Sequence, residues 1–177
     1  MTTKERTTLT KDVANKKIFV SRQFDAPKTK VWEAWTTSSL LDKWWAPKPY
    51  KAITKSMDFR EGGTWLYKME GPDGNGMWAR LDYKKIEPKN YYIALDAFCD
   101  ENGNINTEFS RMNWKNTFVD KGNATSVEIE ITFDKIEDLR PWGILLGDEL
   151  PEQTGKMFNY NKILKSRRKD IVNKKDL

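Results

Sequence analysis

Hydrophobic and polar residues alternate along most of the chain from residue 18 to residue 134. The alternation begins at Ile18, Val20 and Phe24, which predict a first strand. A period of two places successive side chains on opposite faces of a strand, so one face is buried and the other is solvated. Turn-forming residues divide the pattern after Tyr50 into six further predicted strands, at about 51–59, 64–70, 77–87, 91–99, 111–119 and 125–134.

Between the first strand and these six strands, hydrophobic residues recur with the spacing of a helix. Asp25 is a predicted cap for a helix that starts near Pro27 and stops near residues 36–37. Val31 and Trp35 lie on one face of that helix, together with Ala34.

A second short helix is predicted from a capping-box-like start at Ser39 to Trp44 and Trp45. Adjacent residues of a helix point about 100° apart, so both indoles cannot enter the core. We expect one of them to pack in the core and the other to line a cavity mouth or a partner surface.

The C-terminal segment predicts a long amphipathic helix that begins near Pro151. Met157, Tyr160, Leu164 and Ile171 recur at spacings of three, four and seven residues, which places them on one face. A sheet with one apolar face needs a cover, and we expect this helix to supply it.

The predicted order of strand, two helices, six strands and long helix is that of an α+β helix-grip fold. In this fold a curved antiparallel sheet wraps around the C-terminal helix. We predict a polar, disordered tail over residues 1–17, a single domain over 18–172 and a frayed C-terminus over 173–177. The length of 177 residues suits one such domain.

Composition and charge narrow the functional class. The chain is 38% hydrophobic and 32% charged, and no apolar run is long enough to cross a bilayer, so we expect a cytoplasmic protein with no membrane partner. The net charge of +5 comes from the two ends, because residues 1–17 carry five Lys or Arg against two acidic residues and residues 156–177 carry eight against two. A basic folded face for nucleic acid is therefore not expected.

The side chains offer little catalytic chemistry. The sequence has no histidine, which removes the commonest general base and His-ligated zinc. Cys99 is the only cysteine and is read as a structural thiol. We therefore predict no catalytic residues, no metal and no cofactor, and we expect a protein that is not an enzyme.

Aromatic and methionine residues supply the best candidate for a functional site. Trp65, Tyr67 and Met69 alternate on one predicted strand, and a similar set alternates on the strand from residue 111. The predicted cavity-lining residues are Trp45, Trp65, Tyr67, Met69, Trp114, Asn116, Phe118, Met157 and Tyr160. Two interpretations stay open, because these side chains either fill the core or leave an apolar cavity in which a few polar groups orient a ligand.

The strand at 77–83 has two possible orientations. The apolar alternative turns Met77, Ala79, Leu81 and Tyr83 inward, and we predict this one.

Several dispersed motifs resemble one known family. They are Phe-Asp-Ala-Pro at 24–27, Val-Trp at 31–32, Leu-Leu-Asp-Lys-Trp-Trp-Ala-Pro at 40–47, Gly-Gly-Thr-Trp at 62–65, Met-Glu-Gly-Pro-Asp-Gly at 69–74 and Phe-Cys-Asp-Glu-Asn-Gly-Asn at 98–104. Over residues 18–135 the chain is similar to the SRPBCC superfamily of START-like, polyketide-cyclase-like and birch-pollen-allergen-like proteins, in the branch named after the activator of heat-shock protein 90 ATPase. The C-terminal part departs, since the Gly-Trp pair that often precedes the last helix is replaced around Lys156 and Met157.

This resemblance leaves three functions open. The first is a non-enzymatic binding protein for a hydrophobic small molecule, lipid-like or aromatic. The second is a co-chaperone-like protein that contacts a chaperone ATPase. The third is a cyclase- or lyase-type enzyme that uses the same pocket, and a buried carboxylate or Arg on the concave face would favour it.

Overall fold

The computed structural model describes residues 7–46 and 48–139. Their elements follow the order β1 (Thr7–Asp12), β2 (Lys17–Phe24), α1 (Lys28–Thr36), α2 (Ser38–Trp44), β3 (Lys51–Met57), β4 (Thr64–Glu70), β5 (Gly76–Glu87), β6 (Tyr91–Cys99), β7 (Met112–Asp120), β8 (Thr125–Phe133) and η2 (Ile136–Leu139). The predicted strands and short helices are found within a few residues of their expected limits. The antiparallel sheet and the two helices fit the predicted α+β helix-grip architecture.

Strand β1 corrects the prediction for the N-terminus. Residues 7–12 were expected to belong to a disordered tail, but they pair antiparallel with β2, so that Thr7 lies opposite Arg22 and Asp12 opposite Lys17. Leu9 packs against the hydrophobic core. The segment reads as a tail because it is rich in Thr and Lys, yet Thr is β-branched and suits a strand.

The two helix starts also differ from the prediction. The N-cap of α1 is Pro27 and that of α2 is Thr37, and neither makes a side-chain capping hydrogen bond. Asp25 and Ser39 are therefore not the caps. Both helices are instead fixed by the side chains that they bury, which are Val31 and Trp35 from α1 and Leu41 from α2.

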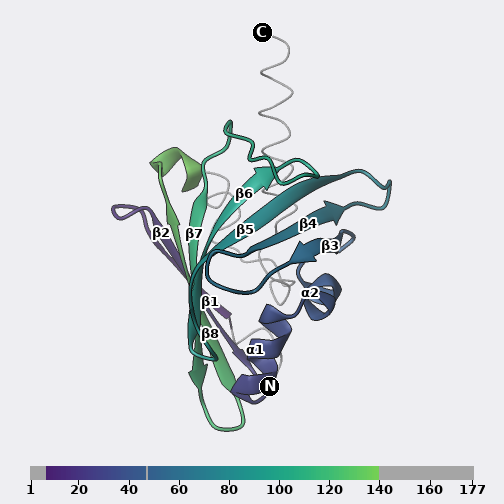
Figure 1. Cartoon of the computed structure of the whole chain (residues 1–177). Coiled ribbons are helices and arrows are strands. Elements are labelled where there is room, and N and C mark those ends of the chain that lie inside the picture. Colours follow the sequence, from purple (N-terminus) through teal and green to yellow (C-terminus); the bar gives the residue numbers. More distant parts are fainter. Residues whose placement is uncertain (1–6, 47, 140–177) are drawn as a thin grey trace.

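The eight described strands form one antiparallel sheet in the order β1-β2-β8-β7-β6-β5-β4-β3. Only the pairing of β2 with β8 joins strands that are distant in sequence. The sheet is curved, and α1 and α2 lie together at one end of it, near β3 and the lower end of β8 (Figure 1).

One face of the sheet carries the hydrophobic core, and we call it the inner face. Across its centre Ile18 lies opposite Ile131, Ile131 opposite Trp114, and Trp114 opposite Ala94, and all four are buried. On β5 the residues Ala79, Leu81 and Tyr83 belong to this core, which confirms the predicted orientation of that strand.

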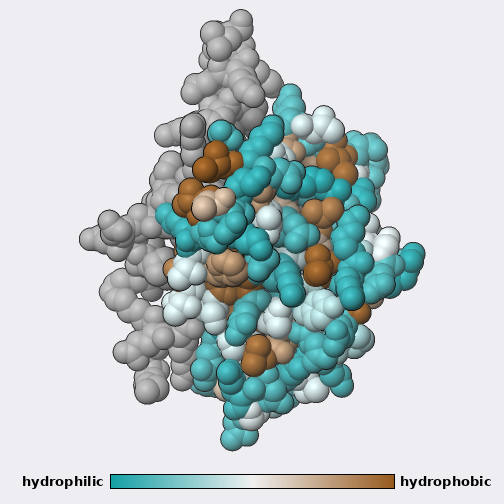
Figure 2. All heavy atoms as spheres, turned by 90° about the vertical axis from the view of Figure 1, so that its left-hand side faces the viewer, coloured by the Kyte–Doolittle hydropathy of each residue, from teal (hydrophilic) through white to brown (hydrophobic). Residues whose placement is uncertain are grey.

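The outer surface has a different character. Figure 2 shows one side of the molecule as mostly hydrophilic, with hydrophobic residues in small separate groups. The large hydrophobic side chains that are exposed within residues 7–139 come from different elements and loops: Val13, Phe19, Ile53, Ile105 and Ile136. Scattered exposed side chains of this kind are usual for a soluble surface.

The predicted final helix from Pro151 falls outside the described residues. The same holds for Met157 and Tyr160 among the predicted site residues.

Candidate functional site

The inner face brings together all seven predicted site residues that the structure describes. Trp65, Tyr67 and Met69 lie on β4, Trp114, Asn116 and Phe118 lie on β7, and Trp45 follows directly after α2; each is between 1% and 7% exposed. The period of two identified the six strand residues, because it separates the two faces of each strand.

Trp45 connects the two strand sets. Its ring centroid is 5.2 Å from that of Trp65 on β4 and 6.5 Å from that of Trp114 on β7. Those strands are three steps apart in the sheet, which is about 14 Å in a flat sheet. One indole reaches both because the sheet curves around it, so Trp45 lies at the centre of the aromatic surface.

The polar atoms of these aromatic residues are bound within the protein. Trp45 Nε1 donates to the Tyr67 hydroxyl at 3.0 Å, and Trp65 Nε1 donates to Thr54 Oγ1 at 2.9 Å. Thr54 Oγ1 in turn donates to Asp42 Oδ1 at 2.6 Å, and the Thr54 amide donates to the same oxygen at 3.0 Å. Asp42 therefore fixes α2 to β3 and holds the Trp65 indole through Thr54.

The two adjacent tryptophans divide their roles as the helical geometry predicts. Trp45 is buried, whereas Trp44 is only partly buried and donates from Nε1 to the Ala34 carbonyl at 3.0 Å. Trp44 also lines an apolar surface hollow of about 230 Å³ beside α1, together with Phe24, Ala26, Lys30, Val31, Ala34 and Trp35.

Five aromatic residues of this surface were not among the predicted site residues, and one of them is Trp35, whose ring centroid lies 5.9 Å from that of Phe118. The other four are Trp32, Phe59, Tyr83 and Tyr92. Trp32 lies 5.0 Å from Phe118 and 6.1 Å from Tyr92, measured between ring centroids. Burial raises the pKa of both tyrosines above the usual value, so they are neutral phenols. Tyr92 was missed because Tyr91 precedes it, so the sequence did not show which of the two faces inward.

Two polar side chains also lie on the inner face. Asp96 is 9% exposed; its Oδ1 accepts from the Met112 amide at 2.8 Å and its Oδ2 accepts from Trp114 Nε1 at 3.2 Å. Asn116 is 2% exposed, and its Oδ1 accepts no hydrogen bond. An unsatisfied buried acceptor costs about 1–3 kcal/mol. Asp96 thus has a structural role in holding β7, while nothing in the described protein pairs with the Asn116 oxygen.

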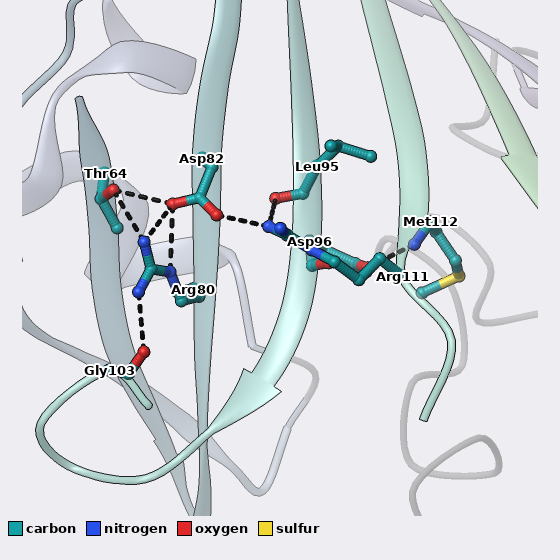
Figure 3. A network of polar contacts seen from close by, with 8 residues as sticks. All are labelled: Thr64, Arg80, Asp82, Leu95, Asp96, Gly103, Arg111 and Met112. Atoms are coloured by element: carbon teal, nitrogen blue, oxygen red, sulfur yellow. Dashed lines mark hydrogen bonds and ion pairs between the residues drawn. The ribbon is translucent and has the colours of Figure 1, made fainter. Parts of the chain in front are cut away.

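A network of charged residues occupies the opposite face of the sheet (Figure 3). Asp82 on β5 forms ion pairs with Arg80 and with Arg111, and its Oδ1 accepts from Thr64 Oγ1 at 2.8 Å. Burial alone raises the pKa of Asp82, but the hydrogen bonds from Thr64 and the two arginines outweigh it, so the pKa lies below its usual value. The carboxylate is therefore ionised at neutral pH.

The same network attaches the loop between β6 and β7. Arg80 Nη1 donates to the Gly103 carbonyl at 2.7 Å, and Arg111 Nε donates to the Asp96 carbonyl at 2.9 Å. The paired register of β6 and β7 ends at Leu95 and Asn113, so Arg111 and the Asp96 side chain continue the attachment where the ladder stops. The ion pairs of Asp82 with Arg80 and Arg111 stabilise the fold on the outer face of the sheet.

The described residues show no further reactive centre. Within residues 7–139 there is no group of three His, Cys, Asp or Glu side chains that could hold a metal, and no described helix is long and apolar enough to cross a membrane. Burial raises the pKa of the Cys99 thiol to about 11, so this thiol is protonated at neutral pH.

The described residues form an α+β protein with an aromatic inner face, and their sheet and two helices fit the helix-grip fold. A family model described as "Activator of Hsp90 ATPase homolog 1-like protein" matches residues 25–141. The chain therefore belongs to this family, as its motifs predicted.

Solved structures of similar fold come from several bacteria. Protein Ms6760 of Mycobacterium smegmatis matches with a TM-score of 0.70 and 23% identity, covering 85% of this chain and 94% of that chain. A protein from Arthrobacter aurescens matches with a TM-score of 0.72 and 27% identity, covering 81% and 85%. A protein from Staphylococcus epidermidis matches with a TM-score of 0.69 and 23% identity, covering 87% and 94%. A search of curated proteins finds no match.

Proposed function

We propose that the protein binds a hydrophobic small molecule, lipid-like or aromatic, against the inner face of its sheet. The observation that carries the proposal is the aromatic and methionine surface formed by β4 and β7 and joined by Trp45. Such side chains offer a large contact area with little charge to desolvate. The family relationship supports the proposal, because this fold commonly holds hydrophobic ligands.

Calorimetric titration and thermal unfolding with a panel of apolar probes test this function. The panel contains 1-dodecanol, 2-naphthol and indole. A ligand at 100 times its Kd stabilises the folded state by about 2.7 kcal/mol. For a chain of this length that raises the unfolding midpoint by roughly 5–11 °C. If no probe of the panel raises the midpoint or gives a binding isotherm, the proposal fails.

The family name supports a second candidate, which is contact with a chaperone ATPase. ATP hydrolysis by an Hsp90 chaperone, measured with and without this protein, distinguishes it from the first. A stimulated rate with no response to the apolar probes would favour the chaperone contact.

An enzyme is the third candidate, and Asp96 bears on it. This residue is the kind of buried carboxylate on the inner face that an enzyme would need. Both of its oxygens, however, already accept hydrogen bonds from Met112 and Trp114. Its geometry is explained without a reaction.

A further inference from the structure

Among the described residues of the inner face, Asn116 carries a fully buried oxygen that accepts no hydrogen bond. It lies in the middle of β7 between Trp114 and Phe118, opposite Tyr92 on β6 and Ile129 on β8. All four of these neighbours are buried hydrophobic residues. An apolar residue at this position would continue the core without the cost of burying an amide.

The neighbouring polar groups do not compensate for this amide. The indole of Trp114 donates to Asp96, and the indole of Trp45 donates to Tyr67. Oδ1 of Asn116 is left without a donor although the residue is only 2% exposed. Most buried polar atoms in proteins have a partner, so an unpaired acceptor on a candidate binding face points to a donor that the described residues do not supply.

We propose that Asn116 is the polar anchor of the inner-face site, and that the ligand is an apolar molecule with a hydroxyl or N–H group that donates to Asn116 Oδ1. This inference rests on the proposed function and narrows it to a ligand class. Donor-bearing apolar molecules include long-chain alcohols, phenols and indoles. A site that is built to hydrogen-bond one group rejects the analogue that lacks it, because its own acceptor is then left unpaired.

Matched probe pairs test this anchor in the full-length protein. Each pair keeps the apolar body and removes only the donor: 2-naphthol with 2-methoxynaphthalene, indole with 1-methylindole, and 1-dodecanol with dodecyl methyl ether. The wild-type protein should bind the donor-bearing member of a pair at least tenfold more tightly, as measured by calorimetric titration.

Two variants test whether the Asn116 side chain causes the preference for donor-bearing probes. Asn116→Leu keeps the approximate size of the side chain and removes its acceptor, so the preference should fall below threefold. Asn113→Leu is the matched control, because Asn113 is on the same strand but points to the opposite face. This control should keep the tenfold preference.

Thermal unfolding without any probe gives an independent readout. The unfolding midpoint of Asn116→Leu should equal or exceed that of the wild type, because the variant removes an unpaired buried acceptor. A midpoint several degrees lower would show that the amide is paired within the chain and would overturn the inference.

The outcomes separate this inference from the proposed function. Equal binding of both members of every pair, tighter binding of the methylated members, or a preference that survives in Asn116→Leu would overturn the anchor and leave the binding function standing. Binding of no probe at all would overturn the proposed function and the anchor with it.

Discussion

At the scale of single residues, Gly63 shows how closely the backbone packs at the start of β4. A Cβ atom at this position would lie 2.0 Å from the Asp58 carbonyl oxygen, far inside any normal contact. The Gly63 amide donates to the Arg60 carbonyl at 2.8 Å, and its carbonyl accepts from the Tyr83 amide at 3.0 Å. The Gly-Gly-Thr-Trp motif therefore has a steric cause.

Gly63→Ala should lower the free energy of unfolding by about 3 kcal/mol or more, because backbone atoms must move to admit the methyl group. Chemical denaturation measures the change. Gly122→Ala is the control. Gly122 has a left-handed backbone with φ of 79°, which strains an alanine, but no atom lies within 4 Å of the added Cβ. The control should cost about 1–2 kcal/mol, and an equal loss in both variants would refute the steric explanation.

Predictions for single residues are correct where the pattern within one strand decides which face a side chain is on. The alternation within β4 and β5 predicts the inner-face positions of Trp65 and Leu81 correctly. It could not predict the partners of Asp96 or the unpaired oxygen of Asn116. Those depend on which strands become neighbours, and the distance along the chain between residues 96 and 116 carries no such signal.

At the scale of elements, β1 is the strand that the sequence did not predict. It is at one end of the sheet and pairs only with β2. Its alternation is weak because three of its six residues are Thr, and its one large apolar residue, Leu9, packs against the core.

Leu9→Ala should lower the free energy of unfolding by about 1–2 kcal/mol, since part of a packed side chain is removed. Thr10→Ala is the control on the same strand, where the side chain is exposed. It should change stability by less than about 0.5 kcal/mol. If neither variant changed the free energy of unfolding, residues 7–12 would behave as the disordered tail that the sequence predicted.

The Asp82 network predicts a pH dependence of stability. Replacing Asp82 with Asn leaves two half-buried guanidinium groups without their carboxylate, and should cost about 2–4 kcal/mol at pH 7. The pKa of Asp82 is lower in the folded state than in the unfolded state. Its contribution is therefore complete above the unfolded pKa of about 3.9 and is lost as the pH falls through the folded pKa.

Denaturation of wild type and Asp82→Asn from pH 7 to pH 2 should show the two curves converging at the acidic end. Asp58→Asn is the matched control, because the pair between Asp58 and Arg60 is exposed. An exposed pair is worth about 0–1 kcal/mol. A difference between wild type and Asp82→Asn that stays constant below pH 4 would contradict the assignment.

At the scale of the whole molecule, the sequence predicted the order of elements from β2 to β8 and the buried faces of β4, β5, β7 and β8. Turn residues marked the strand limits between β3 and β8, and the sheet order follows from hairpins that join sequential neighbours. The pairing of β2 with β8 and the reach of Trp45 across the curved sheet depend on contacts between distant segments, so no local pattern contains them. The predicted helix cover, with Met157 and Tyr160, lies outside the described residues.

Ala79→Leu tests whether the inner face leaves space for a ligand. Ala79 is a small residue between Tyr67 on β4 and Phe98 on β6. If the proposed site exists, the added leucine enters it, stability changes by less than about 1 kcal/mol and probe binding weakens at least tenfold. Thermal unfolding and calorimetric titration measure the two effects.

A filled core would respond in the opposite way. Overpacking would then lower stability by about 1–3 kcal/mol, and there would be no probe binding to lose. Thr132→Leu is the control, because it also introduces a leucine but on the outer side of β8. It should leave stability and probe binding unchanged.

The tryptophans around Trp45 lie close enough together to share their electronic excitation. Ring centroids are 4.8 Å apart for Trp35 and Trp44, 5.6 Å for Trp44 and Trp45, and 5.2 Å for Trp45 and Trp65. Indoles at such separations couple their electronic transitions and pass excitation from ring to ring. The near-ultraviolet circular dichroism should therefore show coupled bands, and replacing Trp45 with Phe should change the emission of the whole group rather than remove one independent emitter.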